Sequence, residues 1–65
     1  MTLPDKLKIL REAAGLSQEN AARRVPVTAN TWSRWERGMK MAADRAPAVA
    51  AALGVSVRKL YEGVE

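Results

Sequence analysis

The chain contains neither cysteine nor histidine among its 65 residues, and this absence limits how so short a chain becomes stable. Small domains often depend on disulfides or on zinc held by Cys and His side chains, and neither is available here. Folding must therefore rest on side-chain packing. Hydrophobic residues make up 48% of the chain, an ordinary share for a globular domain, but alanine supplies many of them. We expect one small domain, residues 1–65, with a thin core.

The same composition argues against catalysis and against a membrane partner. Without Cys or His the chain lacks the usual nucleophile and the usual general base, and its acidic residues are scattered. We therefore expect no enzyme activity, no metal, no cofactor and no small-molecule substrate. No apolar run approaches the ~18 residues that a membrane span needs, and the N-terminus lacks the apolar stretch of a signal peptide. We expect a soluble, cytoplasmic protein.

Helix start and stop signals recur along the whole chain. Thr2, Pro4 and Asp5 open the first helix, because a hydroxyl cap, a first-turn proline and an early acidic residue are typical of helix N-termini. Gly15 can take the left-handed conformation that ends this helix. The expected helices span residues 3–14, 18–24 and 29–37, then a stretch capped by Asp44 with Pro47 in its first turn and ended by Gly54, and a last one from the cap Ser56 to near Gly63. No stretch alternates with a period of two residues, so we predict an all-α fold of five short helices.

The link between the second and third expected helices is short. Pro26 cannot continue a helix, and it biases Val25 toward an extended conformation, so we expect a sharp turn there. Ser17 and Thr28 are good N-caps for the helices on either side of this turn. Residues 17–37 therefore predict a helix-turn-helix.

Positive charge gathers in this part of the chain. The formal net charge of the whole chain is +4. Residues 17–40 hold five basic side chains against two acidic ones, a balance of +3, whereas residues 41–65 are neutral overall. This excess indicates a surface that binds a polyanion, and the competing interpretation is an ordinary solvated surface.

Three sequence blocks in register resemble one family of helix-turn-helix proteins. The blocks are Gly15-Leu16-Ser17-Gln18-Glu19, Trp32-Ser33-Arg34-Trp35-Glu36-Arg37-Gly38, and Ala52-Leu53-Gly54-Val55-Ser56-Val57 followed by Leu60. Together they are similar to the phage Cro and repressor type family, also called the xenobiotic response element family, from about Leu7 to Gly63. The resemblance implies a compact, lambda-repressor-like domain that binds double-stranded DNA.

In this family the third helix reads the DNA, so its outward arc is expected to face the bases. An α-helix fits the ~12 Å wide major groove, and residues near its N-terminus reach base edges there. With residues 28–37 as the recognition helix, the base-contact candidates are Thr28, Ala29, Asn30, Ser33 and Arg34. Asn30 suits adenine, Arg34 suits guanine, and the Ala29 methyl suits the thymine methyl. The competing interpretation of Asn30 and Arg34 is plain solvated helix surface.

Other residues are candidates for phosphate contact. Free N–H groups and the positive end of the dipole at the start of the second helix favour an anion near Ser17 and Gln18. Arg37 and Lys40 lie just past the reading residues of the third helix and are further phosphate candidates. The alternative for Arg37 and Lys40 is surface charge that serves solubility.

Arg11 and Glu36 match a pair that the family uses. The resemblance implies that Glu36 orients Arg11 toward the DNA backbone, which makes Arg11 a phosphate-contact candidate, and that the pair ties two helices together. The alternative is a surface ion pair worth ~0–1 kcal/mol.

The chain departs from the family pattern at three positions. Ala21 stands where the family usually has leucine and Trp32 where it has an aliphatic residue, so a volume lost on one helix is regained on the next. Trp32 and Trp35 lie opposite the reading arc, and we assign them to packing rather than to stacking on bases. Pro26 stands where the family prefers glycine, which puts the family's turn geometry in question.

Family members often dimerise through the start of the fifth helix. Arg58 and Lys59 occupy that place here, and like charges facing their symmetry mates disfavour the contact, so we expect a monomer or a weak homodimer on DNA. An apolar patch for such a contact would consist of Val57, Leu60, Tyr61 and Val64, and Met39 and Met41 either join an interface or pack the loop.

Two functions from different classes remain open at this point. The leading hypothesis is sequence-specific binding of double-stranded DNA, as a transcriptional repressor in a natural protein or as a designed DNA binder, since the regular caps and frequent alanine suit either origin. The alternative is a protein-interaction module, such as the antitoxin of a toxin-antitoxin pair, whose last two helices hold the partner.

Overall fold

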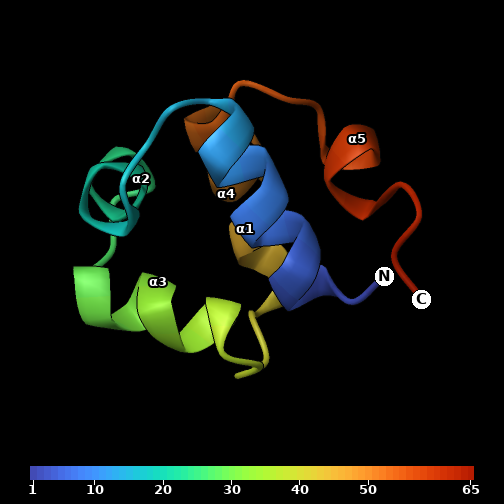
Figure 1. Ribbon diagram of the computed structural model, residues 1–65, viewed down its shortest axis with the longest axis horizontal. Helices are drawn as coiled ribbons and strands as arrows, with labels where there is room; N and C mark the ends of the chain where they lie inside the picture. Colours follow the sequence, from blue (N-terminus) through green and yellow to red (C-terminus); the bar gives the residue numbers. More distant parts are fainter.

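The computed structural model covers residues 1–65 and contains helices and no strands. In chain order the elements are α1 (Leu3–Ala13), α2 (Gln18–Arg24), α3 (Ala29–Glu36), the 3-10 turn η1 (Ala43–Arg45), α4 (Ala46–Leu53) and α5 (Val57–Tyr61) (Figure 1). The predicted all-α fold of five helices is confirmed. None of these helices combines the length and the apolar character that crossing a membrane requires.

Four of the five helices begin at a hydroxyl side chain that caps the helix. The caps are Thr2, Ser17, Thr28 and Ser56, all in extended backbone conformation. Each hydroxyl oxygen accepts a hydrogen bond from the backbone N–H three residues later, at 3.3, 3.0, 3.1 and 3.0 Å respectively. Because each such bond satisfies a backbone donor that the helix itself leaves free, a cap is worth ~1 kcal/mol. These start signals were predicted correctly.

The start of α4 differs from the prediction, which made Asp44 its cap. Asp44 lies inside η1, and α4 begins at Ala46 without any side-chain cap. An N-cap needs extended backbone, and here that conformation falls on Ala42, with φ −64° and ψ 137°, two residues before Asp44. The predicted first-turn proline and the end of α4 at Gly54, with φ 72°, are confirmed.

The turn between α2 and α3 also differs from the prediction. Val25 was expected to be extended, but it continues the helical conformation with φ −66° and ψ −47°, and the Val25–Pro26 peptide bond is cis. The side chain of Val25 is buried in the core, and its backbone N–H donates to the Ala22 carbonyl at 3.2 Å. Burial and this hydrogen bond therefore outweigh the local bias that proline imposes on the preceding residue.

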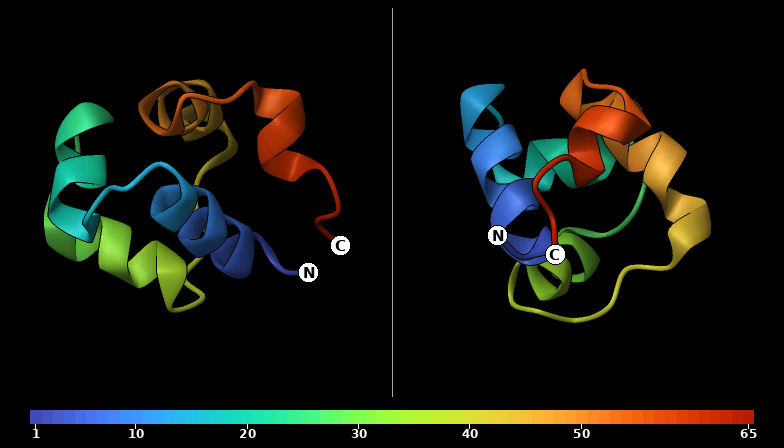
Figure 2. Two further views of the ribbon diagram at one scale, coloured as in Figure 1. Left: turned by 45° about the horizontal axis from the view of Figure 1, so that its top comes forward. Right: turned by 90° about the vertical axis from the view of Figure 1, so that its right-hand side faces the viewer.

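α1 lies between α3 and α5, and α4 contacts α2 and α5 (Figure 1). α2 and α3 lie together on one side of α1, and α5 lies on the opposite side, with α1 contacting both α3 and α5 (Figures 1 and 2). The two chain ends lie side by side and are joined by a hydrogen bond, in which the Glu65 backbone N–H donates to the Met1 carbonyl at 3.0 Å. This arrangement places the two helices of the helix-turn-helix at one end of the molecule, away from α5.

The core is small and is organised around the two indoles. Trp32 is fully buried and Trp35 is 6% exposed, and their rings meet edge to face with centroids 5.7 Å apart. Ala21 and Ala22 are both buried on α2, which packs against α3, the helix that carries both indoles. The assignment of both tryptophans to packing is confirmed.

The predicted apolar patch on the last helix is smaller than expected. Leu60 is fully buried against the rest of the core, so it cannot belong to a surface patch, whereas Val57 and Tyr61 are 40% and 37% exposed. Met41 packs in the core, but Met39 stays on the surface. Leu60 points inward because α5 packs on α1 and α4. Val57 and Tyr61, four residues apart, share the outward face of the helix.

Candidate nucleic-acid interface

The outward face of α3 is free of protein contacts that would hide it. Ala29, Asn30 and Arg34 are exposed, Ser33 is partly exposed, and the cap Thr28 is exposed. The two tryptophans of the same helix point the other way, into the core. The base-contact candidates are therefore brought together on one accessible arc. Base contact by each of these residues stays a prediction.

Two of the candidate hydroxyls already have a structural task. The Thr28 hydroxyl oxygen accepts from the Thr31 backbone N–H and lies 2.8 Å from the Thr31 hydroxyl. The Ser17 hydroxyl oxygen accepts from the Asn20 N–H at 3.0 Å. A hydroxyl has one donor and two acceptor sites, so the Ser17 O–H is still available to an external acceptor. Contacts from Thr28 to a base and from Ser17 to a phosphate stay predictions.

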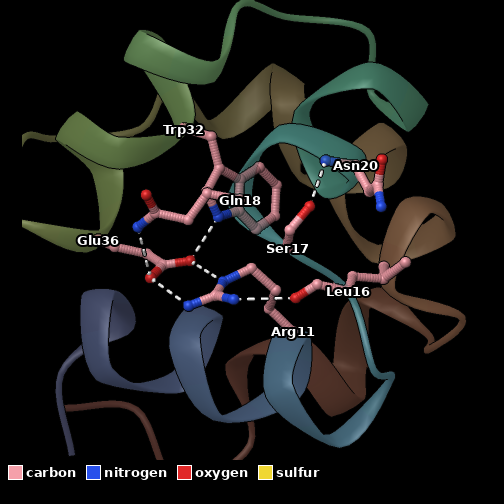
Figure 3. A network of polar contacts seen from close by, with 7 residues as sticks. All are labelled: Arg11, Leu16, Ser17, Gln18, Asn20, Trp32 and Glu36. Carbon is pink, nitrogen blue, oxygen red and sulfur yellow. Dashed lines mark hydrogen bonds and ion pairs between the residues drawn. The ribbon is translucent and has the colours of Figure 1, made fainter.

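A network centred on the Glu36 carboxylate joins three helices (Figure 3). Arg11 on α1 approaches it with two nitrogens, Nε to Oε2 at 2.6 Å and Nη2 to Oε1 at 3.1 Å, and its Nη1 donates to the Leu16 carbonyl at 2.9 Å. Gln18 at the start of α2 donates its Nε2 to Glu36 Oε1 at 3.1 Å. The indole Nε1 of Trp32, one turn back on α3, donates to Glu36 Oε2. We call Arg11, Gln18, Trp32 and Glu36 the carboxylate network.

The carboxylate network is largely shielded from water. The side chains of Arg11 and Glu36 are only 12% and 4% exposed, so the pair is not an ordinary surface ion pair. The bidentate geometry holds α1 and α3 at a defined separation, and the amide of Gln18 adds α2 to the same anchor. The inter-helix tie that the family resemblance implied for Arg11 and Glu36 is present.

The charge state of Glu36 follows from these contacts. Burial by itself raises the pKa of the Glu36 carboxyl, but hydrogen bonds from Arg11, Trp32 and Gln18, together with the charge of Arg11, outweigh it and hold that pKa below its ordinary value. The hydrogen bond to Glu36 raises the pKa of Arg11. The pair is therefore an ionised one, and it adds no net charge to the surface beside α3.

The network changes how Arg11 and Gln18 can act as phosphate ligands. Arg11 uses three of the five N–H groups of a guanidinium inside the protein, and Gln18 uses one of its two amide N–H groups. Each side chain keeps N–H groups for another acceptor, and phosphate contact by either stays a prediction. The sequence does contain a signal for the indole bond. A buried indole N–H needs a partner, and Glu36 stands four residues after Trp32 on the same helix face.

Positive charge without an acidic partner gathers at the C-terminal end of α3. Arg34, Arg37 and Lys40 are exposed and form no salt bridge, whereas Arg23 is paired with Glu19 at 3.0 Å. Arg34 and Arg37 also line a shallow open hollow together with Met39. Arg34, Arg37 and Lys40 are predicted site residues, whereas Met39 is an additional residue of this face. No group of three or more carboxylates gathers anywhere that could hold a metal ion.

Comparison with known proteins agrees with this geometry. The helix-turn-helix domain family matches residues 3–60, which takes in α1 to α4 and most of α5. None of the curated proteins compared with the chain matches it. A helix-turn-helix presents its second helix for insertion into the major groove of DNA, and α3 is that helix here. With the match covering most of its length, the chain belongs to the helix-turn-helix domain family, a family built around a DNA-binding motif.

Proposed function

We propose that this domain binds specific sequences of double-stranded DNA by placing α3 in the major groove, in the manner of the phage Cro and repressor type proteins. The observation that carries the proposal is the division of α3 into a buried indole face and an exposed arc of Ala29, Asn30 and Arg34 beside unpaired cations. Such a domain acts by occupancy and performs no chemistry. In a bacterial cell, a cytoplasmic protein of this kind represses transcription by covering a promoter of the bacterial or phage genome.

Within the proposed complex, two sets of residues do different work. Asn30 bridges N6 and N7 of an adenine, Arg34 forks onto O6 and N7 of a guanine, and Ala29 touches a thymine methyl, each good bidentate pair discriminating by ~1–3 kcal/mol. Arg37 and Lys40 bind phosphates, which holds the helix in register without reading sequence. Gln18, held by Glu36, and the adjoining Ser17 and Arg11 make the phosphate contacts of the opposite groove edge.

Selection from a randomised duplex library tests this proposal. We expect enrichment of one short site containing a guanine and an adenine, and an affinity that falls with log[salt] at a slope of roughly −0.9 per phosphate contacted. A short asymmetric site indicates a monomer, and a palindrome indicates a dimer. Failure to enrich any site, with no binding of any duplex at low ionic strength, contradicts the proposal.

A second candidate function is a protein-interaction module that uses the other end of the molecule. The observation that favours it is the exposure of Val57 and Tyr61 one turn apart on α5, away from α2 and α3. Arg58 and Lys59 are exposed in the same helix, which works against a tight symmetric dimer there. Binding through this apolar pair should depend little on salt, so the salt slope separates the two candidates.

A further inference from the structure

Met39 is held in a fixed place at the end of α3 although its side chain is open to solvent. Gly38, with φ 111°, reverses the chain, and its N–H donates to the Trp35 carbonyl at 3.2 Å. The Met39 N–H then donates to the Arg34 carbonyl at 2.9 Å. These two bonds satisfy helix carbonyls and tie the Met39 backbone to Arg34, the predicted guanine reader.

The Met39 side chain is more exposed than any other large hydrophobic side chain of the protein, at 55%. In helix ends of this type an apolar residue at this position usually covers the last helical turn. Because the residue is 55% exposed, any such contact covers only part of Met39. Capping of α3 therefore explains where the Met39 backbone lies but not what its side chain faces.

The surroundings of Met39 restrict what can lie against it. The shallow, open hollow is bordered on three sides, by Arg34 and Arg37, which carry guanidinium groups, and by the apolar Met39. A ligand that suits all three sides carries negative charge close to a small apolar group. The outer edge of the major groove has this composition where a thymine occurs, because the thymine 5-methyl is the apolar group on the base edges and the backbone phosphates lie beside it.

We infer that the hollow formed by Arg34, Arg37 and Met39 is a subsite for the 5-methyl group of a thymine, and that Met39 is a specificity-determining residue. The inference rests on the proposed binding of α3 in the major groove. Arg34 occupies the neighbouring guanine edge and Arg37 a phosphate, so the thymine lies next to the guanine in the site. A methionine suits this task because its flexible, polarisable side chain adapts its shape to a small apolar group.

The test replaces each thymine of the selected duplex, one at a time, with deoxyuridine, which removes only the methyl group. For the wild-type protein we expect one replacement next to the Arg34 guanine to weaken binding about fourfold, the value of one buried methyl group. Met39→Ala should bind the thymine duplex about fourfold more weakly than the wild type and should no longer distinguish thymine from deoxyuridine at that position. Met39→Leu should keep most of the discrimination.

Ile9→Ala is the matched control, because Ile9 is a similarly exposed aliphatic residue, at 47%, on α1. It should leave both affinity and discrimination unchanged. The inference is overturned if Met39→Ala still distinguishes the two bases, or if it weakens all duplexes equally, as a contact with the sugar-phosphate backbone would. A wild-type protein that binds no duplex overturns the proposed function as well, so the two failures are distinguishable.

Discussion

The polar groups on the two faces of α3 differ in their exposure and in their hydrogen-bond partners. On the inner face the Trp32 indole and the Glu36 carboxylate are bonded within the protein and shielded from water. On the outer face Asn30 and Arg34 are exposed and make no side-chain hydrogen bond to another residue. The polar groups of the inner face therefore stabilise the fold, and those of the outer face remain free to bind a ligand.

This contrast predicts that substitutions on the two faces change different quantities, the free energy of unfolding for one face and DNA affinity for the other. A change at a buried residue such as Trp32 should alter the free energy of unfolding, and DNA affinity only through the loss of folded protein. A change at Glu36 should also alter DNA affinity, because Glu36 positions the phosphate candidates Arg11 and Gln18. An outer-face variant should leave the free energy of unfolding within about 0.5 kcal/mol and alter DNA affinity directly.

The largest effect is expected for Trp32→Ala. This change removes a fully buried indole from a thin core, which should lower the free energy of unfolding by about 3–5 kcal/mol, much of what a domain of this size has. Urea denaturation followed by far-ultraviolet circular dichroism measures it. Arg34→Ala, two residues away on the outer face, is the control and should unfold like the wild type. Equal losses in the two variants would contradict the division of α3 into two faces.

The next largest effect concerns the carboxylate network. Glu36→Gln leaves the shielded Arg11 guanidinium without its countercharge and should lower the free energy of unfolding by about 2–4 kcal/mol near neutral pH. The matched control is Glu19→Gln, which removes an exposed partner of Arg23 and should cost less than about 1 kcal/mol.

The pH dependence of the same variant tests the charge of Glu36. Because folding lowers the pKa of this carboxyl below its ordinary value of 4.5, its contribution to stability is fully present above that pH and is lost as the pH falls through the folded-state pKa. The wild type should therefore lose more stability than Glu36→Gln as the pH falls through and below 4.5. Denaturation midpoints measured across that range would contradict the assignment if the two curves stayed parallel.

Much of this fold could be predicted from local signals, and the Arg11–Glu36 pair of the carboxylate network from the family resemblance, but the hydrogen bond from Gln18 to Glu36 could not. Thr2, Ser17, Thr28 and Ser56 act as caps because capping depends on residues within one turn of one another. Local signals failed at Val25, where burial in the core outweighs the influence of the following proline.

The limits at the candidate site have the same physical origin. The outward arc of α3 follows from the spacing of the indoles, because residues on one helix have fixed relative directions. Gln18 on α2 donates to Glu36 on α3, and the hollow beside Met39 depends on where the side chains of Arg34 and Arg37 lie. Such relations depend on side-chain conformation and on packing angles that no short stretch of sequence contains.

On the outer face, Arg34→Ala should weaken binding to the selected site by about 1–3 kcal/mol and relax the preference at one base pair, because the lost bonds are to a base edge. Competition between the selected duplex and a set of single-base variants measures the preference. A variant that binds more weakly but keeps the full preference for guanine would show that Arg34 contacts the backbone instead.

The smallest effect is expected for Arg37→Ala, and what distinguishes it is that it should not depend on the DNA sequence. Arg37 stands one turn further along than Arg34 and is predicted to hold a phosphate, so its loss should weaken binding to every duplex alike, by about 1 kcal/mol. The slope of log affinity against log[salt] should fall by about one, since one fewer counterion is released. Titrations of specific and random duplexes at several salt concentrations separate this result from that of Arg34→Ala. If both variants showed the same sequence-independent loss, the outer face would hold DNA without reading it, and the reading residues would have to be sought among Asn30 and its neighbours at the start of α3.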